Sequence, residues 1–155
     1  MNVGIVLAII GMALAVGMAG LGSIYGVGIS VEAAMGVLSE DPSKFGKLLV
    51  LSLLPGTQGL YGFIVAFLMM TGSGVLGGGV DISWQTGLTY LVASLPIAIG
   101  GFFSARAQGR AAVAGISLVA KRPGEFGKAM VSTTLVEIYA LLSLLISLLT
   151  VVNIK

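Results

Sequence analysis

Four long apolar stretches alternate with short polar connectors along the chain. They cover residues 3–38, 45–71, 84–120 and 126–152. Because a helix needs about 20 apolar residues to span a bilayer, each stretch is long enough to form a transmembrane helix. The first and third exceed the thickness of a bilayer, so we expect them to project into water at one end. The pattern predicts an all-α membrane protein with four transmembrane helices.

The second half of the chain repeats the first half with a shift of 81 residues. The connector at 39–44 resembles the one at 121–125, and both are followed by Phe-Gly-Lys. We therefore expect two tandem helical hairpins, the first in residues 1–80 and the second in residues 81–155. Pairs that match in this one register, without gaps, include Gly20 with Gly101, Ser23 with Ser104, Gly28 with Gly109, Pro42 with Pro123 and Lys47 with Lys128.

Each repeat holds two spans, so both hairpins should enter the membrane in the same direction, with both ends of the chain on one side. The middle connector, residues 72–83, contains Asp81 and no basic residue. The positive-inside rule then predicts a multi-pass cell-membrane protein with cytoplasmic hairpin turns and both ends outside, and only Lys155 opposes this. The basic residues that gather at the turns are Lys44, Lys47, Arg106, Arg110, Lys121, Arg122 and Lys128.

Glycine is concentrated in the first and third spans, for example at Gly22, Gly26 and Gly109. Small residues let helix backbones approach closely within a membrane. The second and fourth spans carry bulkier residues, such as Phe63 and Leu144. We expect an inner layer made of the first and third spans, with the second and fourth spans outside it.

The composition agrees with a membrane protein and excludes several other classes. Hydrophobic residues make up 57% of the chain and charged residues 9%, and the mean hydropathy is +1.09, which leaves no room for a separate soluble domain. The net charge of +2 comes from basic residues that we interpret as topology signals, not as a nucleic-acid-binding surface. The absence of cysteine and histidine excludes disulfides, thiolate metal sites and a Ser-His-Asp triad.

Glu137 is the main candidate for chemistry because it lies near the middle of the fourth span. A carboxylate at membrane depth costs several kcal/mol unless it is neutralised or paired, so it is a functional-site hypothesis by default. The alternative is a permanently protonated carboxyl that only holds helices together. The shift of 81 residues places Glu137 on Gly56, so the duplication yields one titratable site per four helices.

A polar stripe lies on the second span. Leu54, Thr57, Gln58 and Tyr61 have the spacing of residues on one helix face. Pro55 cannot donate a backbone hydrogen bond, so we expect a loosened helix with backbone oxygens available nearby.

Gln108 supplies a further amide oxygen from the third span. Together with Glu137, Thr57, Gln58 and backbone carbonyls, it completes an all-oxygen set that suits a hard cation. A proton site needs only the carboxyl and one acceptor. The competing interpretation of the three neutral side chains is ordinary hydrogen bonding between helices.

These motifs resemble those of the duplicated proteolipid, or K subunit, of bacterial V-type ATPases, and the likeness covers almost the whole chain. Its most specific element is Leu-Pro-Gly-Thr-Gln-Gly-Leu-Tyr-Gly at 54–62, joined by Ala-Gln-Gly around Gln108 and Val-Glu-Ile-Tyr around Glu137. The resemblance implies a rotor ring that carries Na⁺, with H⁺ as the alternative coupling ion and Li⁺ as a substitute. It implies that the ion is held by Glu137, Gln58, Gln108, Thr57 and the backbone oxygen of Leu54, with Tyr61 hydrogen-bonded to the carboxylate.

The resemblance and the backbone argument differ on one ligand. Pro55 directly frees the carbonyl of Leu51, whereas the family implicates that of Leu54. We keep Leu54 as the ligand and Pro55 as a source of local loosening.

The same resemblance implies a subunit that is not itself an enzyme, with ATP hydrolysed elsewhere in the complex. The Gly-x-Gly-x-x-Gly segment at 72–77 follows no strand, so we interpret it as a loop and not as a phosphate site. The implied partners are further copies in a homo-oligomeric ring, a membrane stator subunit that supplies an arginine, central-stalk subunits at the cytoplasmic turns, and lipid, but no nucleic acid. We assign Arg106 and Arg110 to topology or to pairing with Glu32.

Two other functions compete with this hypothesis. A small proton-coupled exporter would use Glu137 as its coupling acid. It would also require a substrate cavity lined by aromatic side chains, and Tyr61 and Tyr139 alone are too few to form one. A purely structural assembly or channel would keep its transport when Glu137 is replaced by Gln.

Overall fold

The computed structural model describes residues 2–77 and 81–154, so Lys155 and part of the middle connector lie outside the described residues. The described residues form only helices and connecting turns, and four helical stretches are long and apolar enough to cross a membrane. The prediction of an all-α protein with four spans is confirmed. The helices are α1 (Val3–Glu40), α2 (Phe45–Leu53), α3 (Thr57–Gly72), α4 (Trp84–Lys121), α5 (Phe126–Thr134) and α6 (Glu137–Val152), with short 3₁₀ turns η1 (Pro42–Lys44), η2 (Leu54–Gly56), η3 (Val75–Gly77) and η4 (Pro123–Glu125).

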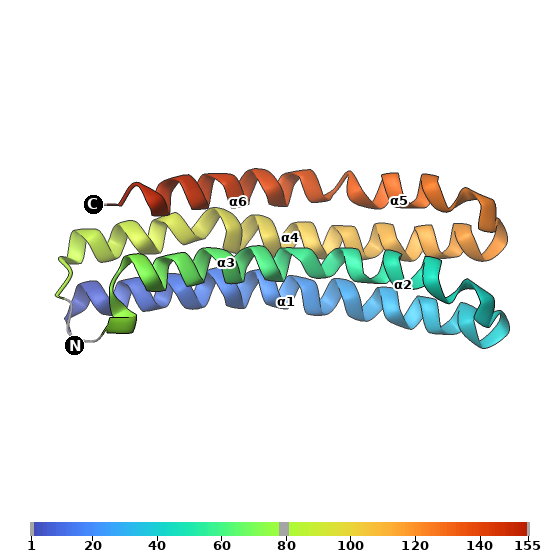
Figure 1. Cartoon of the computed structure of the whole chain (residues 1–155), viewed down its shortest axis with the longest axis horizontal. Helices are drawn as coiled ribbons and strands as arrows, with labels where there is room; N and C mark the ends of the chain where they lie inside the picture. Colours follow the sequence, from blue (N-terminus) through green and yellow to red (C-terminus); the bar gives the residue numbers. More distant parts are fainter. Residues whose placement is uncertain (1, 78–80, 155) are drawn as a thin grey trace.

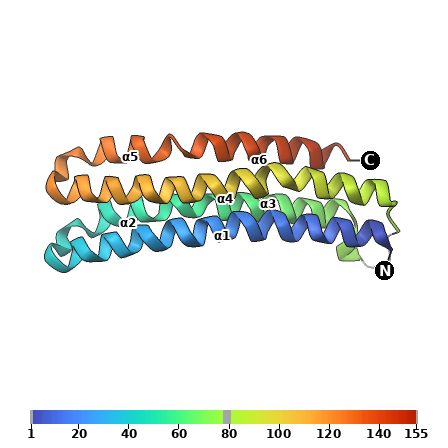
Figure 2. The same ribbon diagram turned by 180° about the vertical axis from the view of Figure 1, so that it is seen from behind.

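The helices lie side by side in one elongated bundle (Figure 1). The start of α1 and the end of α6 lie at the same end of the bundle, and the two hairpin turns lie at the other end. The view from behind shows the same order, with α5 and α6 next to α4, and α1 at the opposite edge (Figure 2). The second and fourth spans are each made of two helices, α2 with α3 and α5 with α6.

The sequence repeat is visible in the helix boundaries. Helices α1 and α4 are both 38 residues long, and α2 and α5 are both nine residues long. The second and fourth spans are interrupted at matching places, at Leu54–Gly56 in the first hairpin and at residues 135–136 in the second. Pro55 predicts the first interruption, but the second has no proline and was not predicted.

Helices α1 and α4 pack against each other, α3 packs mainly on α1, and α6 packs mainly on α4. Glycines make the contact between α1 and α4 close, because a Cβ added to Gly22 would lie 2.6 Å from the carbonyl oxygen of Phe102. A Cβ on Gly109 would lie 2.5 Å from the Cα of Gly26. The small residues therefore let the two long helices approach at backbone distance.

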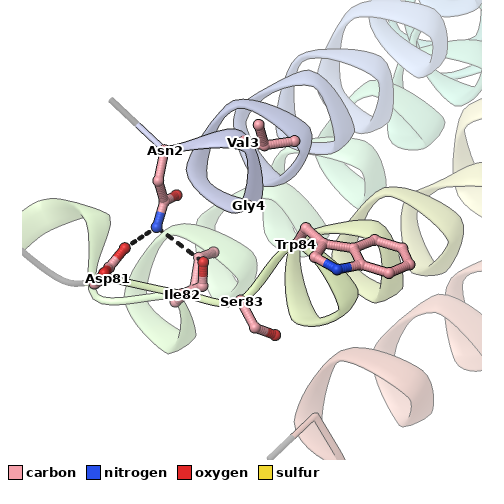
Figure 3. Close-up of a pocket in the computed structure, with 7 residues that line it drawn as sticks. All are labelled: Asn2, Val3, Gly4, Asp81, Ile82, Ser83 and Trp84. Atoms are coloured by element: carbon pink, nitrogen blue, oxygen red, sulfur yellow. Dashed lines mark hydrogen bonds between the residues drawn. The ribbon is translucent and has the colours of Figure 1, made fainter.

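Asn2 ties the start of α1 to the middle connector (Figure 3). Its side-chain oxygen accepts a hydrogen bond of 2.9 Å from the backbone N–H of Ile5, which caps the helix. Its amide nitrogen donates to the carboxylate of Asp81 and to the carbonyl of Ile82. The first turns of α1 and α4 are thereby held together.

The two hairpin turns are linked by lysines of the first repeat. Lys44 Nζ donates 2.9 Å to the carbonyl of Ala120, and Lys47 Nζ donates 2.9 Å to that of Pro123. Lys44 also forms an ion pair of 3.1 Å with Asp41. Each turn is therefore held both by local contacts and by its neighbour.

The suggested pairing of Glu32 with Arg106 or Arg110 is wrong for the described part of the chain, where the ion pairs are Lys44–Asp41 and Lys128–Glu125. The guanidinium of Arg106 lies 4.6 Å from the centre of the Tyr25 ring. It also lies 5.2 Å from the centre of the Phe102 ring, so the charged group of Arg106 is placed against two aromatic rings.

Candidate functional site

The carboxylate of Glu137 lies where α3, α4 and α6 meet. Its Oε1 accepts hydrogen bonds from the Thr57 hydroxyl at 2.8 Å and from the Tyr61 hydroxyl at 2.5 Å. Its Oε2 accepts from the amide Nε2 of Gln108 at 3.4 Å. With a side chain only 8% exposed, Glu137 is held by three neutral donors from two other helices.

The interruptions of the second and fourth spans position these groups. Thr57 is the first residue of α3, after η2, and Glu137 is the first residue of α6, after the turn at 135–136. A carboxylate in the first turn of a helix is favoured by the positive end of the helix dipole. Two broken helices therefore place a hydroxyl and a carboxylate opposite each other at the same depth.

The backbone carbonyl of Leu54 is linked to the carboxylate of Glu137 by the hydroxyl of Thr57, which is within hydrogen-bond distance of both. It accepts from the Thr57 backbone N–H in the 3₁₀ turn and from the Thr57 hydroxyl at 3.0 Å. A hydroxyl has one proton and cannot donate to Leu54 and Glu137 at once. The Thr57 hydroxyl, the Leu54 carbonyl and the Glu137 carboxylate thus form an oxygen cluster in which two acceptors share one hydroxyl proton. Pro55 is buried at this turn.

Two fully buried glutamines extend the cluster into the bundle. Gln58 Nε2 donates to Gln108 Oε1 at 2.5 Å and to the Ser104 hydroxyl at 3.3 Å. Gln108 Nε2 also donates to the carbonyl of Thr133 at 3.3 Å. Gln58 Oε1 is buried and has no hydrogen-bond partner among the described residues. An unpaired buried oxygen costs free energy that a bound cation or proton donor would recover.

Ser104 and Thr133 belong to this network and were missed in the sequence. The repeat offered a signal for Ser104, because its counterpart Ser23 lies at the matching place in the first hairpin. Ser23 accepts 2.8 Å from the backbone N–H of Gly59, while Ser104 donates 3.4 Å to the carbonyl of Val136. Each serine contacts the second helical span of its own hairpin next to the interruption. Thr133 contributes a backbone oxygen, which no sequence pattern reveals.

The charges of the site suit one monovalent cation. No cluster of three or more His, Cys, Asp or Glu residues occurs in residues 2–77 and 81–154. A singly charged cation on Glu137 makes the site neutral, whereas a divalent ion would leave a net positive charge at membrane depth, which is costly. The predicted residues Glu137, Thr57, Tyr61, Gln58, Gln108 and Leu54 come together in one hydrogen-bonded cluster.

Comparisons with known proteins agree with the duplicated hairpin. The sequence pattern of the ATP synthase C-subunit family matches the chain twice, at residues 10–69 and 91–150. The chain is 47% identical over 152 residues to a protein of Enterococcus hirae named V-type sodium ATPase subunit K, with 98% of this chain and 94% of the relative covered. It is 42% identical over 150 residues to a protein of Methanocaldococcus jannaschii named A-type ATP synthase subunit K, with 97% of this chain and 64% of the relative covered.

Proposed function

The chain belongs to the ATP synthase C-subunit family, and we propose that it is the rotor-ring proteolipid of a V-type ATPase, which binds Na⁺ and carries it across the membrane during ATP-driven rotation. One observation carries this proposal. The carboxylate of Glu137, in the fourth span, is nearly buried and is surrounded by neutral oxygen-bearing side chains. A site with one negative charge can be emptied and refilled by one cation.

Sodium is the ion that the donor set fits best. Glu137, the Thr57 hydroxyl and the Leu54 carbonyl converge, and the buried oxygen of Gln58 has no partner in the described chain. Hard cations without strong geometric demands are bound by such mixed carboxylate, hydroxyl and carbonyl oxygens. Lithium has the same charge and ligand preference and is expected to substitute. The E. hirae relative is named a sodium ATPase subunit, which supports the same assignment.

Neutralisation is the physical basis of transport. When Na⁺ binds, the charge of Glu137 is cancelled, so the loaded site can face lipid at much lower cost than an empty carboxylate. When the ion leaves, Thr57, Tyr61 and Gln108 hold the anion by hydrogen bonds. Moving one charge against 100 mV requires about 2.3 kcal/mol, and one site per four helices gives each ion a large share of the work of ATP hydrolysis.

The other components of the proposed ATPase complex are separate chains. We infer that the subunit is non-catalytic and that copies of it form the ring. A stator subunit would supply an arginine for the emptied site, and central-stalk subunits would contact the hairpin turns. The basic residues near those turns favour a cytoplasmic location for them, with the start of α1 and the end of α6 outside.

Carbodiimide labelling of Glu137, with and without Na⁺, tests the proposal on the intact complex in membranes. Carbodiimides react with a protonated carboxyl, so bound sodium should slow labelling in proportion to its occupancy, and Li⁺ should do so at higher concentration. The Glu137→Gln variant is the control that must remain unlabelled and inactive in ATP-driven transport. If Na⁺ gives no protection at any pH, the coupling ion is H⁺. If Glu137→Gln still pumps, the rotor assignment of this carboxylate is wrong.

A further inference from the structure

A second charged group lies at the depth of the cation site, on the opposite side of α4. It is Arg106, a half-buried residue between Ser104 and Gln108. These two neighbours lie one turn apart on the face of α4 that meets the fourth span, where Ser104 donates to a backbone carbonyl and Gln108 donates to Glu137. A residue two positions from each of them lies on the opposite face of the helix. The side chain of Arg106 is therefore directed away from Glu137.

Two aromatic rings hold the guanidinium of Arg106 at this depth. It lies 4.6 Å from the centre of the Tyr25 ring on α1 and 5.2 Å from that of the Phe102 ring on α4. Phe102 precedes Arg106 by one turn, on the side away from η4. A long basic side chain near the end of a span otherwise extends toward water. The rings instead keep the charge close to the level of Ser104, which is also the level of the cation site.

The charge of Arg106 is not cancelled by an ion pair within residues 2–77 and 81–154, where both ion pairs belong to the hairpin turns. A guanidinium also stays protonated throughout the physiological pH range. Its electric field therefore reaches Glu137 across α4, over a distance on the order of 10–15 Å, about the diameter of a helix with its side chains. Arg110 lies one turn nearer to η4, and its exposed side chain is free to extend toward water.

We propose that the fixed charge of Arg106 weakens the binding of sodium at Glu137. The charge attracts the carboxylate of the empty site, and it repels the cation that would enter. Binding of Na⁺ neutralises the carboxylate, so this attraction is lost in the loaded site. At an effective dielectric constant of about 20, a charge at this distance changes a binding constant roughly three- to tenfold.

A weakened site has a clear use in the proposed sodium transport, on which this inference rests. An ion that is released where sodium is abundant must leave a site that does not hold it too tightly. The neutral ligands around Glu137 favour capture of the ion, while Arg106 favours its departure. Arg106 is thus a residue that tunes affinity without contacting the ion.

Arg106→Gln tests the proposal in the intact complex. Equilibrium binding of radioactive sodium is measured on the purified complex at alkaline pH, where protons compete least, with choline chloride holding the ionic strength constant. Loss of the charge should lower the sodium concentration for half-saturation roughly three- to tenfold. Tighter binding is the distinctive sign, because a substitution that only disturbed the packing of the site would weaken it. Unchanged or weaker binding would overturn the inference.

Two further variants separate charge from shape. Arg106→Lys keeps the positive charge and should bind sodium as the wild type does. Tyr25→Leu removes a ring that holds the guanidinium, so it should tighten binding in the same direction as Arg106→Gln but by less. Equal tightening in Arg106→Lys and Arg106→Gln would show that the shape of the side chain matters and not its charge, which contradicts the proposal.

Arg110→Gln is the matched control, because it removes the same charge from the same helix one turn farther along. It should change sodium binding less than Arg106→Gln does, and an equal change would contradict a specific role for Arg106. Failure of the wild type to bind sodium would instead refute the proposed sodium function. The two failures are therefore distinguishable in one set of binding curves.

Discussion

The hydroxyl of Tyr61 donates a 2.5 Å hydrogen bond to Oε1 of Glu137, so a side chain of the first hairpin holds the acid of the second. Thr57, one turn earlier in α3, donates to the same oxygen at 2.8 Å. The candidate site therefore exists only where the two hairpins meet. The first hairpin supplies two hydroxyl donors, and the second hairpin supplies the acid together with the amide donor of Gln108.

Replacing Tyr61 with Phe should increase the rate at which Glu137 reacts with a carbodiimide in the absence of sodium. The tyrosine occupies Oε1 of Glu137, one of the two oxygens that can attack the reagent, and a hydrogen bond to a charged group contributes about 1.5–3 kcal/mol, so its loss should raise the labelling rate roughly tenfold. Labelling rates at fixed pH measure this. The control is Tyr139→Phe, whose side chain is 69% exposed and has no hydrogen bond to Glu137 among the described contacts. Equal rates for both variants would contradict a role for Tyr61.

Replacing Gln58 with Met should weaken protection by sodium and leave carbodiimide labelling in its absence nearly unchanged. The substitution keeps the length of the side chain but removes the buried oxygen that lacks a partner. Loss of one ligand oxygen worth about 1–3 kcal/mol should raise the sodium concentration needed for protection by roughly tenfold or more. Gln85→Met, on the exposed first turn of α4, is the matched control. Unchanged protection in the Gln58 variant would remove this glutamine from the ligand set.

The spans and most of the site could be predicted from the sequence, because a lipid bilayer requires long apolar stretches and makes any polar residue within them conspicuous. The stretch 84–120 became α4, Trp84–Lys121, with a difference of one residue at its end. Polar side chains within a membrane need hydrogen-bond partners, so we expected Thr57, Gln58, Gln108 and Glu137 to lie together. Proline at 55 also marked the first interruption.

Other features could not be predicted because they depend on tertiary contacts. Leu135 and Val136 are ordinary helix residues, yet the helix is interrupted there, where Ser104 donates to the carbonyl of Val136. The orientation of the Gln58 amide is set by Gln108 and not by its own helix. The hydrogen bond from the Asn2 side chain to the carbonyl of Ile82 likewise joins residues far apart in the chain, and no local sequence pattern at either residue predicts it.

Ser147→Ala should destabilise the protein by about 1 kcal/mol, because it would remove the hydroxyl that accepts a hydrogen bond from a buried backbone N–H. Pro96 disturbs α4, since a proline ring clashes with the carbonyl one turn earlier. The following N–H, of Ile97, donates 3.1 Å to the fully buried hydroxyl of Ser147 on α6. Thermal unfolding of the purified protein in detergent measures the change. Ser143→Ala is the control, because the Ser143 hydroxyl donates to a backbone carbonyl of its own helix. An equal loss of stability in both variants would contradict this explanation.

Asp41, in the first hairpin turn, should stabilise the protein near neutral pH but not in strong acid. Hydrogen bonds from the Ser43 side chain, and then from Lys44, hold the pKa of this carboxyl below its usual value. A group with a lowered pKa in the folded state stabilises above its unfolded pKa, and this contribution is lost as the pH falls through the folded pKa. The difference in melting temperature between the wild type and Asp41→Asn should therefore be constant near neutrality and vanish in acid. A difference that persists below both pKa values would point to shape and not to charge.

Gly26→Ala should lower both stability and sodium protection, since Gly26 of α1 touches two elements that hold the site. A Cβ there would lie 2.5 Å from the carbonyl of Ala105 in α4 and 2.7 Å from Cβ of Pro55 in η2. Overpacking of this kind costs about 1–3 kcal/mol, and pushing η2 outward moves the Leu54 carbonyl and Thr57 away from Glu137. Gly36→Ala is the matched control on the same helix, because its Cβ position has open space. Melting temperature and sodium protection are measured on both variants. If stability falls in the Gly26 variant while sodium protection is unchanged, the contact with Pro55 serves packing alone, and the position of η2 does not depend on the absence of a side chain at Gly26.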